Sequence, residues 1–352
     1  MVKENAMKQT EIGLIPEDWE VKELGELLQF GSGRDYKHLK NGEIPVYGTG
    51  GLMTYVNDYL YDGSSVGIGR KGTIDKPVFL EGKFWTVDTL FFTHSFKDSL
   101  PKFIYYKFNK IPWKEYNEAS GVPSLNKNTL EAIQIPLPPL AEQEAIAAAL
   151  SDCDAWIESL EAIIAKKRLI KQGAMQELLT PKEDWEVKKL GEILQFGSGR
   201  DYKHLNDGEI PVYGTGGIMT YVNSHLFDGE SVGIGRKGTI DKPVFLKGKF
   251  WTVDTLFFTH SFTGVIPKYI YYQFLQIAWK EYNEASGVPS LNKNTLEQIE
   301  IKIPSFSEQT RIATVLSDMD AELEALVQKL NKARQIKQGM MQELLTGRVR
   351  LG

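Results

Sequence analysis

Glycine-rich and charged stretches are the first candidates for chemistry in this chain. Gly67-Ile-Gly-Arg-Lys-Gly72 is similar to a nucleotide-binding loop, but it lacks the G-x-x-x-x-G-K-[ST] spacing and no long helix is expected to follow it. A turn at the end of a strand, with Arg70 and Lys71 directed toward a phosphate backbone, fits these residues better. We therefore expect no mononucleotide site here.

An acidic pair with a lysine is the residue set of some metal-dependent nucleases. Such a set occurs as Asp75, Glu81 and Lys83, and the same stretch recurs 166 residues later as Asp241, Lys247 and Lys249. A lysine cannot replace a carboxylate as a ligand of Mg²⁺, so a site of this kind would be lost in the second copy. We expect charged turns here, with no catalytic residue and no metal site.

One glycine-rich stretch is close to a cofactor loop. Phe30-Gly-Ser-Gly33 approaches the loop of S-adenosylmethionine-dependent methyltransferases but lacks the complete Phe-x-Gly-x-Gly. The Pro138-Pro139 pair stands between leucines, outside the Asn/Asp-Pro-Pro-aromatic signature of adenine methyltransferases. None of the five histidines has a cysteine near it in a metal-binding spacing. The sequence therefore predicts no cofactor site in this chain.

Basic, aromatic and small polar residues gather in loops that each occur twice. Arg, Lys, Asn and Ser are the side chains that contact phosphates and base edges in DNA complexes. A helix expected to begin near Asn126 could also offer its N-terminal amides to a phosphate. Ordinary solvated turns are the alternative for loops of this composition. The predicted DNA-binding residues are Arg34, Tyr36, Lys37, His38, Tyr47, Thr49, Arg70, Lys71, Ser124, Asn126, Lys127, Arg200, Tyr202, Lys203, His204, Tyr213, Thr215, Arg236, Lys237, Ser290, Asn292 and Lys293.

The chain as a whole is a duplication. A constant offset of 166 residues aligns the two copies without a gap, so the repeating unit is one domain plus one connector. In each copy, short apolar runs such as Ile44–Tyr47 predict strands, and Pro101–Lys114 predicts a helix. The recurring segments include Leu28–Leu39 (again at 194–205), Val66–Leu80 (232–246), Gly82–Phe96 (248–262) and Trp113–Glu131 (279–297).

Two long segments of helical character follow the mixed domains. In each, apolar residues step by four and three, which is the spacing of helices that pack side by side. Since neither helix has a core of its own, we expect them to pair with one another. The seam residues are Ile146, Leu150, Cys153, Ile157, Leu160, Ile164, Ile312, Leu316, Met319, Leu323, Leu326 and Leu330. The expected order is a mixed domain at 1–140, a helix at 141–180, a mixed domain at 181–305 and a helix at 306–352.

Composition narrows the class of protein. The formal net charge is −5, and the mixed domains carry −2 and −1. A free-standing DNA-binding domain is usually basic, so this balance favours one that shares the duplex with basic partner subunits. The single cysteine excludes an intramolecular disulfide, and no run of about 18 apolar residues is present. A cytoplasmic protein without a membrane span is expected.

Several of these stretches resemble the specificity (S, HsdS) subunits of type I restriction–modification enzymes. Ile12–Gly25 and Pro181–Gly191 are similar to the openings of the family's target-recognition domains. Ile135–Asp152 resembles its P-P-L-x-E-Q-x-x-I-A-x-x-L entry to a conserved helix, and 303–318 repeats it less perfectly. The resemblance covers essentially the whole chain, twice and in the family's order. The stretches that resemble the ends of the family's conserved helices are Lys171–Thr180 and Lys337–Arg350.

The resemblance implies an α+β protein. Two mixed α/β target-recognition domains, related by a pseudo-twofold axis, would be separated by a pair of long antiparallel conserved helices with coiled-coil-like packing. The ligand would be double-stranded DNA, and the partners would be two methyltransferase (M) subunits and restriction (R) subunits, with no membrane. S-adenosylmethionine, ATP and Mg²⁺ would belong to those partners, so the chain would not itself be an enzyme.

The near identity of the two copies departs from the usual family pattern, in which the recognition domains are unrelated. If both domains read the same half-site on opposite strands, the target is an interrupted palindrome. Half-sites about 34–36 Å apart, one turn of the duplex, would place both domains on one face. Two alternatives stay open: a scaffold that does not bind DNA, and a stand-alone nuclease or methyltransferase with two lobes.

Overall fold

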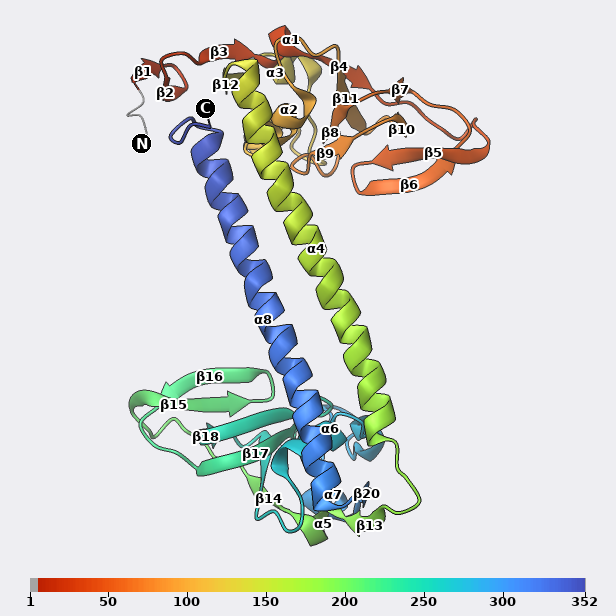
Figure 1. Cartoon of the computed structure of the whole chain (residues 1–352), viewed down its shortest axis with the longest axis vertical. Coiled ribbons are helices and arrows are strands. Elements are labelled where there is room, and N and C mark those ends of the chain that lie inside the picture. Colours follow the sequence, from red (N-terminus) through yellow and green to blue (C-terminus); the bar gives the residue numbers. More distant parts are fainter. Residues whose placement is uncertain (1–5, 352) are drawn as a thin grey trace. The chain divides into compact units, whose positions relative to one another are not determined.

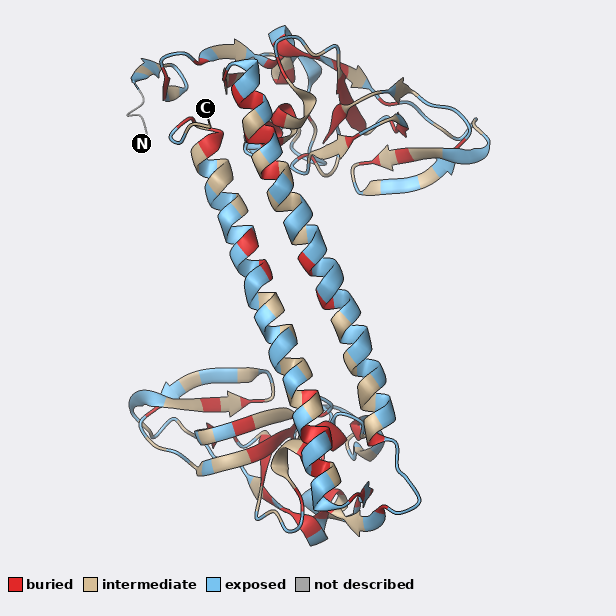
Figure 2. Ribbon diagram, in the orientation of Figure 1, coloured by how far each residue is buried: buried red, intermediate tan, exposed pale blue. Residues whose placement is uncertain are grey.

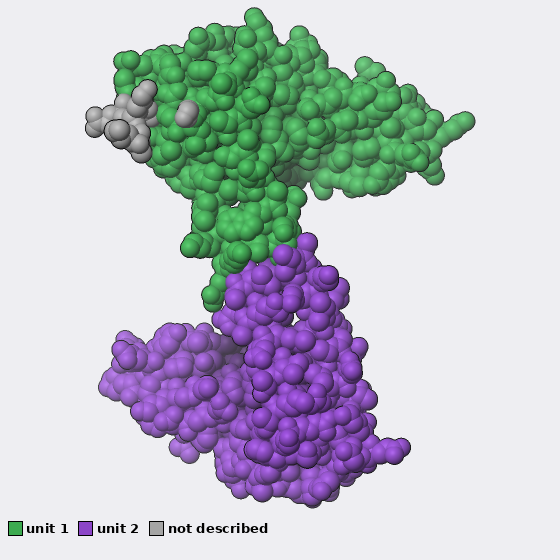
Figure 3. Space-filling model, viewed as in Figure 1, with its two compact units in different colours: residues 1–161, 328–352 green, residues 162–327 purple. Residues whose placement is uncertain are grey.

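The computed structural model describes residues 6–351, and the chain divides into two compact units (Figure 3). Unit 1 comprises residues 1–161 and 328–352, and unit 2 comprises residues 162–327. Each unit therefore contains one mixed domain, part of the first long helix and part of the second. We call the two mixed domains head 1 and head 2.

Head 1 is built from short strands and three small α-helices (Figure 1). Its helices are α1 (Leu24–Leu27), α2 (Pro101–Phe108) and α3 (Lys127–Glu131), with a 3₁₀ turn, η1, at Trp113–Tyr116. Its strands are β1 (Met7–Thr10), β2 (Gly13–Pro16), β3 (Glu20–Glu23), β4 (Gln29–Ser32), β5 (Asn41–Gly48), β6 (Gly51–Val56), β7 (Tyr61–Asp62), β8 (Ser65–Gly69), β9 (Val78–Leu80), β10 (Lys83–Thr86), β11 (Leu90–His94) and β12 (Gln134–Leu137).

Head 2 repeats the order of elements from β3 onward, with one strand, β17, in place of β7 and β8 and one strand, β18, in place of β9 and β10. Its helices are α5 (Leu190–Ile193), α6 (Pro267–Phe274) and α7 (Lys293–Gln298), with a 3₁₀ turn, η2, at Trp279–Tyr282. Its strands are β13 (Glu186–Lys189), β14 (Gln195–Ser198), β15 (Asp207–Gly214), β16 (Gly217–Val222), β17 (Phe227–Gly235), β18 (Val244–Thr252), β19 (Leu256–His260) and β20 (Glu300–Ile303).

The larger sheets of the two heads are divided differently. Head 1 has two four-stranded sheets, ordered β6-β5-β10-β7 and β4-β11-β8-β9, whereas head 2 has one six-stranded sheet, β14-β19-β17-β18-β15-β16. In head 2, Glu230 pairs with Lys247 across β17 and β18, and their side chains form an ion pair of 3.4 Å. The matching residues of head 1 are Ser64 and Glu81, which cannot form that ion pair, and the strands are interrupted there.

The long helices complete the cores of the heads (Figure 2). α4 (Leu140–Leu179) and α8 (Phe306–Leu344) have 40 and 39 residues. In unit 1, Ile146 and Leu150 of α4 and Leu344 of α8 join the buried cluster of head 1. In unit 2, Ile312 and Leu316 of α8 join that of head 2, together with the end of α4. Because heads and helices share apolar surface, neither buries its core alone.

The two long helices run antiparallel beside each other in both units. In unit 1, Lys337 of α8 pairs with Asp154 of α4, and Arg334 pairs with Glu161 at 2.6 Å. In unit 2, Lys171 pairs with Asp320, and Lys167 pairs with Glu322 at 2.7 Å. The twelve predicted seam residues are all buried or half-buried. Cys153 contributes its thiol to a 3.4 Å contact with the Met340 sulfur.

A tyrosine hydroxyl also links each head to the long helices by a hydrogen bond. The Tyr106 hydroxyl of α2 donates to Asp154 at 2.7 Å, the same carboxylate that pairs with Lys337. In unit 2 the Tyr272 hydroxyl donates to Asp320 at 2.7 Å. Burial raises the pKa of both phenols, so each stays a neutral donor. The head, α4 and α8 are thus fastened at one carboxylate in each unit.

The helix predicted over Pro101–Lys114 is shorter than expected. α2 ends at Phe108, and a 3₁₀ turn follows at Trp113. The Trp113 indole N–H donates to the Phe108 carbonyl at 2.7 Å, so a side chain takes up a carbonyl at the end of the helix. Trp279 does the same to Phe274 in head 2. The predicted end of the helix was wrong, because this contact between the Trp113 side chain and the Phe108 carbonyl is not visible in the sequence.

Candidate nucleic-acid interface

The turn at residues 87–89, between β10 and β11, gathers three of the predicted loops in head 1. The Arg34 amide donates to the Thr86 carbonyl at 2.8 Å, and the Trp85 indole donates to the Arg34 carbonyl at 2.8 Å. The Val87 amide donates to the Tyr47 carbonyl at 3.0 Å. These bonds fix the 34–38 loop and the end of β5 against one short turn.

The Arg70–Lys71 turn contacts the same 87–89 turn. The Arg70 and Lys71 amides both donate to the Thr89 carbonyl, at 2.7 and 3.2 Å. The Arg70 guanidinium lies 5.8 Å from the centre of the Phe91 ring and donates weakly, at 3.5 Å, to the Asp88 carbonyl. The cationic side chain is therefore tethered near the turn while it stays exposed.

The fourth loop is joined to the third by backbone hydrogen bonds. The Leu125 amide donates to the Arg70 carbonyl at 2.9 Å, and the Gly72 amide donates to the Pro123 carbonyl at 2.9 Å. Lys71 and Ser124 form an antiparallel bridge. We call the assembled surface the loop cluster: residues 34–38, 47–49, 70–72, 87–89 and 119–127. The structure thus brings together all the predicted DNA-binding residues of head 1.

Side chains of the loop cluster differ in how freely they could contact a ligand. Arg34, Lys37, His38, Arg70, Lys71, Asn126 and Lys127 are exposed. Two of them have partners, since Lys127 lies 3.5 Å from Glu131 and the Asn126 side-chain oxygen accepts from the Asn128 amide. Tyr36, by contrast, is half-buried against the Val46 and Trp85 core, so its ring supports the loop. Tyr47, Thr49 and Ser124 are half-buried too, Ser124 within the bridge to Lys71. Exposure therefore leaves the side chains of Arg34, Lys37, His38, Arg70 and Lys71 accessible to a ligand.

Head 2 has the same loop cluster, with the same backbone hydrogen bonds. Arg200 donates to the Thr252 carbonyl at 2.8 Å, Val253 to Tyr213 at 3.0 Å, and Arg236 to Thr255 at 2.7 Å. The exposed residues are again Arg200, Lys203, His204, Arg236, Lys237, Asn292 and Lys293, while Tyr202, Tyr213, Thr215 and Ser290 are half-buried. Every predicted contact residue is the same amino acid in both heads.

The expected phosphate site at a helix N-terminus needs correction. The helix that follows Asn126 is α3, which has only five residues, and its counterpart α7 has six. The Asn126 side chain already accepts from the Asn128 amide at 2.9 Å, as Asn292 does from Asn294. A short helix whose free amide is capped by its own side chain has little to offer an anion.

Sequence reasoning missed the residues that organise the loop cluster. The 87–89 turn was not singled out, nor was Asn117, whose side chain accepts from the Ala119 and Ser124 amides. The stretch Trp85-Thr-Val-Asp-Thr-Leu90 recurs unchanged as 251–256, which was the available signal. Its organising role depends on pairings between distant segments, such as the parallel register of β5 and β10, and these are not local features of the sequence.

Other charged groups that could suggest catalysis have structural partners. Asp75 forms a 2.9 Å ion pair with Lys114, whose hydrogen bond lowers the pKa of the carboxyl. Asp241 and Lys280 repeat this pair at 2.9 Å. Desolvation lowers the pKa of His94, whose ring nitrogen contacts the Ser95 hydroxyl at 2.9 Å. Residues 6–351 contain no group of His, Cys, Asp and Glu side chains arranged to hold a metal ion.

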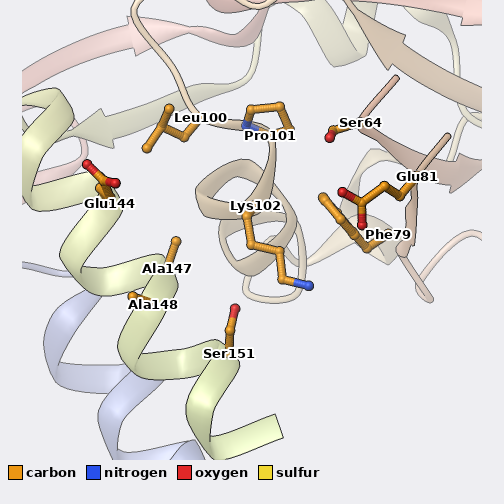
Figure 4. Close-up of a pocket in the computed structure, with 10 residues that line it drawn as sticks. All are labelled: Ser64, Phe79, Glu81, Leu100, Pro101, Lys102, Glu144, Ala147, Ala148 and Ser151. Atoms are coloured by element: carbon orange, nitrogen blue, oxygen red, sulfur yellow. The ribbon is translucent and has the colours of Figure 1, made fainter. Parts of the chain in front are cut away.

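A groove of about 450 Å³ in unit 1 lies away from the loop cluster (Figure 4). It is lined by residues of β9, α2 and α4, with Lys102 lying 4.1 Å from the centre of the Phe79 ring. Ser64 and Glu81 at its edge are replaced by Glu230 and Lys247 in head 2. A function common to both heads is therefore better assigned to the loop cluster than to this groove.

Comparison with known proteins defines the family. A family model described as "Type I restriction modification DNA specificity domain" matches residues 16–167 and again 182–335. Since these matches cover most of the chain, the protein belongs to the type I restriction–modification DNA specificity family. No helix among the described residues is both long and apolar enough to cross a membrane.

Relatives match along nearly the whole chain. The type I restriction enzyme MjaVIII specificity subunit of Methanocaldococcus jannaschii is 24% identical over 99% of this chain and 97% of its own length. The EcoprrI specificity subunit of Escherichia coli is 26% identical over 77% and 73%. The type I S subunit of M. genitalium has 18% identity over 93% and 96% of the two chains and a TM-score of 0.75, which shows a shared fold.

Proposed function

We propose that this chain is the component of a type I restriction–modification system that reads a bipartite DNA target, each loop cluster reading one half-site. The observation that carries this proposal is the assembly of the predicted contact residues into one exposed surface on each head. Its role is recognition, so the chain itself is not an enzyme. Adenine methylation with S-adenosylmethionine, and ATP- and Mg²⁺-dependent cleavage, belong to the M and R subunits in this proposal.

The two half-sites are proposed to be the same sequence in inverted orientation. Both loop clusters have identical contact residues and the same backbone bonds, so their base preferences should match. The differences between the heads lie elsewhere, for example at Ser64 and Glu230 or at Lys107 and Gln273. If the two heads read opposite strands of one duplex, the target is an interrupted palindrome.

The long helices are proposed to hold the two M subunits. Leu169 of α4 is 70% exposed, and Ile163 and Ile170 are also exposed, so apolar side chains remain uncovered on a helix that is already paired with α8. Apolar groups left uncovered on a helix suit a partner helix packed against them. The R subunits would join this assembly, which we place in the cytoplasm with the DNA.

Substituting the clustered arginines tests the recognition role. With an M subunit present, we expect Arg70→Ala and Arg236→Ala each to weaken binding to the target duplex by about tenfold, because each removes one phosphate or base-edge contact. The double variant should lose about the product of the two factors. Lys110→Ala, an exposed lysine outside the loop cluster, is the matched control.

The result also separates the alternatives. Equal gel shifts for the wild type and all four variants would contradict the loop cluster as the DNA-binding surface and would favour a scaffold. Methyl transfer or cleavage by the purified chain alone, without M or R subunits, would instead support a two-lobed enzyme.

A further inference from the structure

An apolar side chain stands among the polar residues of each loop cluster. Val122 lies at the tip of the 119–124 loop and is 65% exposed, as is Val288 in head 2. Its neighbours Gly121 and Pro123 are exposed as well. A valine this exposed contributes little to the core of the head, and its methyl groups are free to contact a ligand.

The loop that carries Val122 is held rigid from within. The Asn117 side-chain oxygen accepts from the amides of Ala119 and Ser124 at 3.1 and 2.9 Å, and its nitrogen donates to the Ala119 carbonyl at 2.9 Å. The Glu118 amide adds a bond to the Ser124 carbonyl at 3.1 Å. Asn283 makes the same three bonds in head 2.

The tip is also fixed beside the cations. Pro123, the next residue, accepts from the Gly72 amide at 2.9 Å, and Ser124 bridges Lys71. Val122 is two residues before Ser124, the bridge partner of Lys71, and therefore belongs to the surface proposed to face DNA. A duplex whose phosphates reach Arg70 and Lys71 would bring its groove to the valine.

The size and shape of valine indicate which part of DNA it would contact. Valine has a single favoured rotamer in many settings, so it loses little entropy when it is buried on binding. Side chains that unstack base pairs from the minor groove are usually longer or bulkier, such as Phe, Leu, Ile or Met. In the major groove, the apolar group that distinguishes one base is the C5-methyl group of thymine.

We propose that Val122 and Val288 are specificity-determining residues that each read one thymine, by packing their γ-methyl groups against its C5-methyl group in the major groove. The inference rests on the proposed function and names one base in each half-site. The Asn117 and Asn283 bonds are what hold the valine at a fixed height above the groove.

The contact is tested by removing the methyl group of the thymine or the methyl groups of the valine. The full chain is assembled with its M subunit on duplexes that carry the target, and each thymine pair of the half-sites is replaced by deoxyuridine, which lacks only the C5-methyl. At one position we expect binding to weaken by about fourfold per half-site, the value of one buried methyl group. The Val122→Ala/Val288→Ala double variant should bind the thymine duplex correspondingly less well and be indifferent to deoxyuridine there.

The controls separate this inference from the function on which it rests. Val187→Ala, a 54% exposed valine on β13, should keep the full deoxyuridine effect, and thermal unfolding should be unchanged in all variants. Specific binding with no sensitive thymine, or with the same sensitivity in the Val122/Val288 variant, would overturn the inference alone. Absence of any sequence preference with the M subunit present would overturn the proposed function.

Discussion

Arg350, near the chain end, makes the densest polar contact in unit 1. Its guanidinium donates to both Asp18 oxygens at 2.7 Å and to Glu142 at 2.5 and 2.6 Å. Glu142 is buried and also accepts from the Trp19 indole at 3.0 Å.

In head 2 the matching Trp185 indole is buried without a partner, because Glu308 is engaged by Lys182 instead. The same tryptophan thus has different surroundings in the two heads.

Replacing Arg350 should loosen unit 1. We expect Arg350→Ala to lower the free energy of unfolding by about 2 kcal/mol, because it leaves the buried Glu142 carboxylate without its cation. Arg348→Ala is the control: Arg348 is exposed and lies 3.8 Å from Glu343, so its loss should cost less than about 0.5 kcal/mol. Denaturant unfolding measures both, and equal effects would contradict the role given to Arg350.

Lys107 makes unit 1 sensitive to pH. It is buried, donates to the Leu345 carbonyl at 2.9 Å, and desolvation lowers its pKa to about 7. Between pH 7 and about 10.5 the unfolded chain keeps a proton that the folded unit has lost, so the free energy of unfolding should rise with pH across this window.

The counterpart in head 2 supplies the comparison for that prediction. There Gln273 donates to the Tyr269 hydroxyl at 2.5 Å. A Phe103→Tyr/Lys107→Gln variant should therefore fold with this neutral pair and lose the rise in stability between about pH 7 and 9.5. Thermal unfolding at the two pH values measures it, and an identical rise in the variant and the wild type would contradict the assignment to Lys107.

At the scale of elements, the two long helices carry different outer faces. Ile163 and Leu169 of α4 correspond to Lys329 and Gln335 of α8. Leu169→Arg should weaken binding of the M subunit by roughly tenfold, because a cation would replace apolar area buried on docking.

The equivalent position of α8 provides the matched control. Gln335 is exposed and polar, so Gln335→Arg introduces the same cation without removing apolar area and should weaken M-subunit binding less than Leu169→Arg does. Titration of labelled M subunit measures both variants. Unchanged affinity for Leu169→Arg would remove this face of α4 from the docking surface.

Sequence patterns predicted the helices and loops better than they predicted where a helix ends or which loops contact one another. The steps of four and three anticipated α4 and α8 because burial along a helix repeats in the sequence itself. The end of α2 was missed because the Trp113 indole turns back onto it. The four predicted loops could be named separately, but their meeting at residues 87–89 depends on contacts between distant strands.

At the scale of the whole molecule, the duplication carries the argument. Two identical loop clusters, each supported by its own core and by both long helices, imply two identical readings of DNA. The resemblance to specificity subunits, now supported by the family match, supplies the partners but not the symmetry of the target. That symmetry comes from the identity of the two heads at every predicted contact residue.

The most direct test is the methylome of cells that express this chain together with its M subunit. The account predicts one methylated motif made of two identical half-sites in inverted orientation around a fixed spacer. A bipartite motif with two different half-sites, or two half-sites repeated in the same orientation, would contradict it.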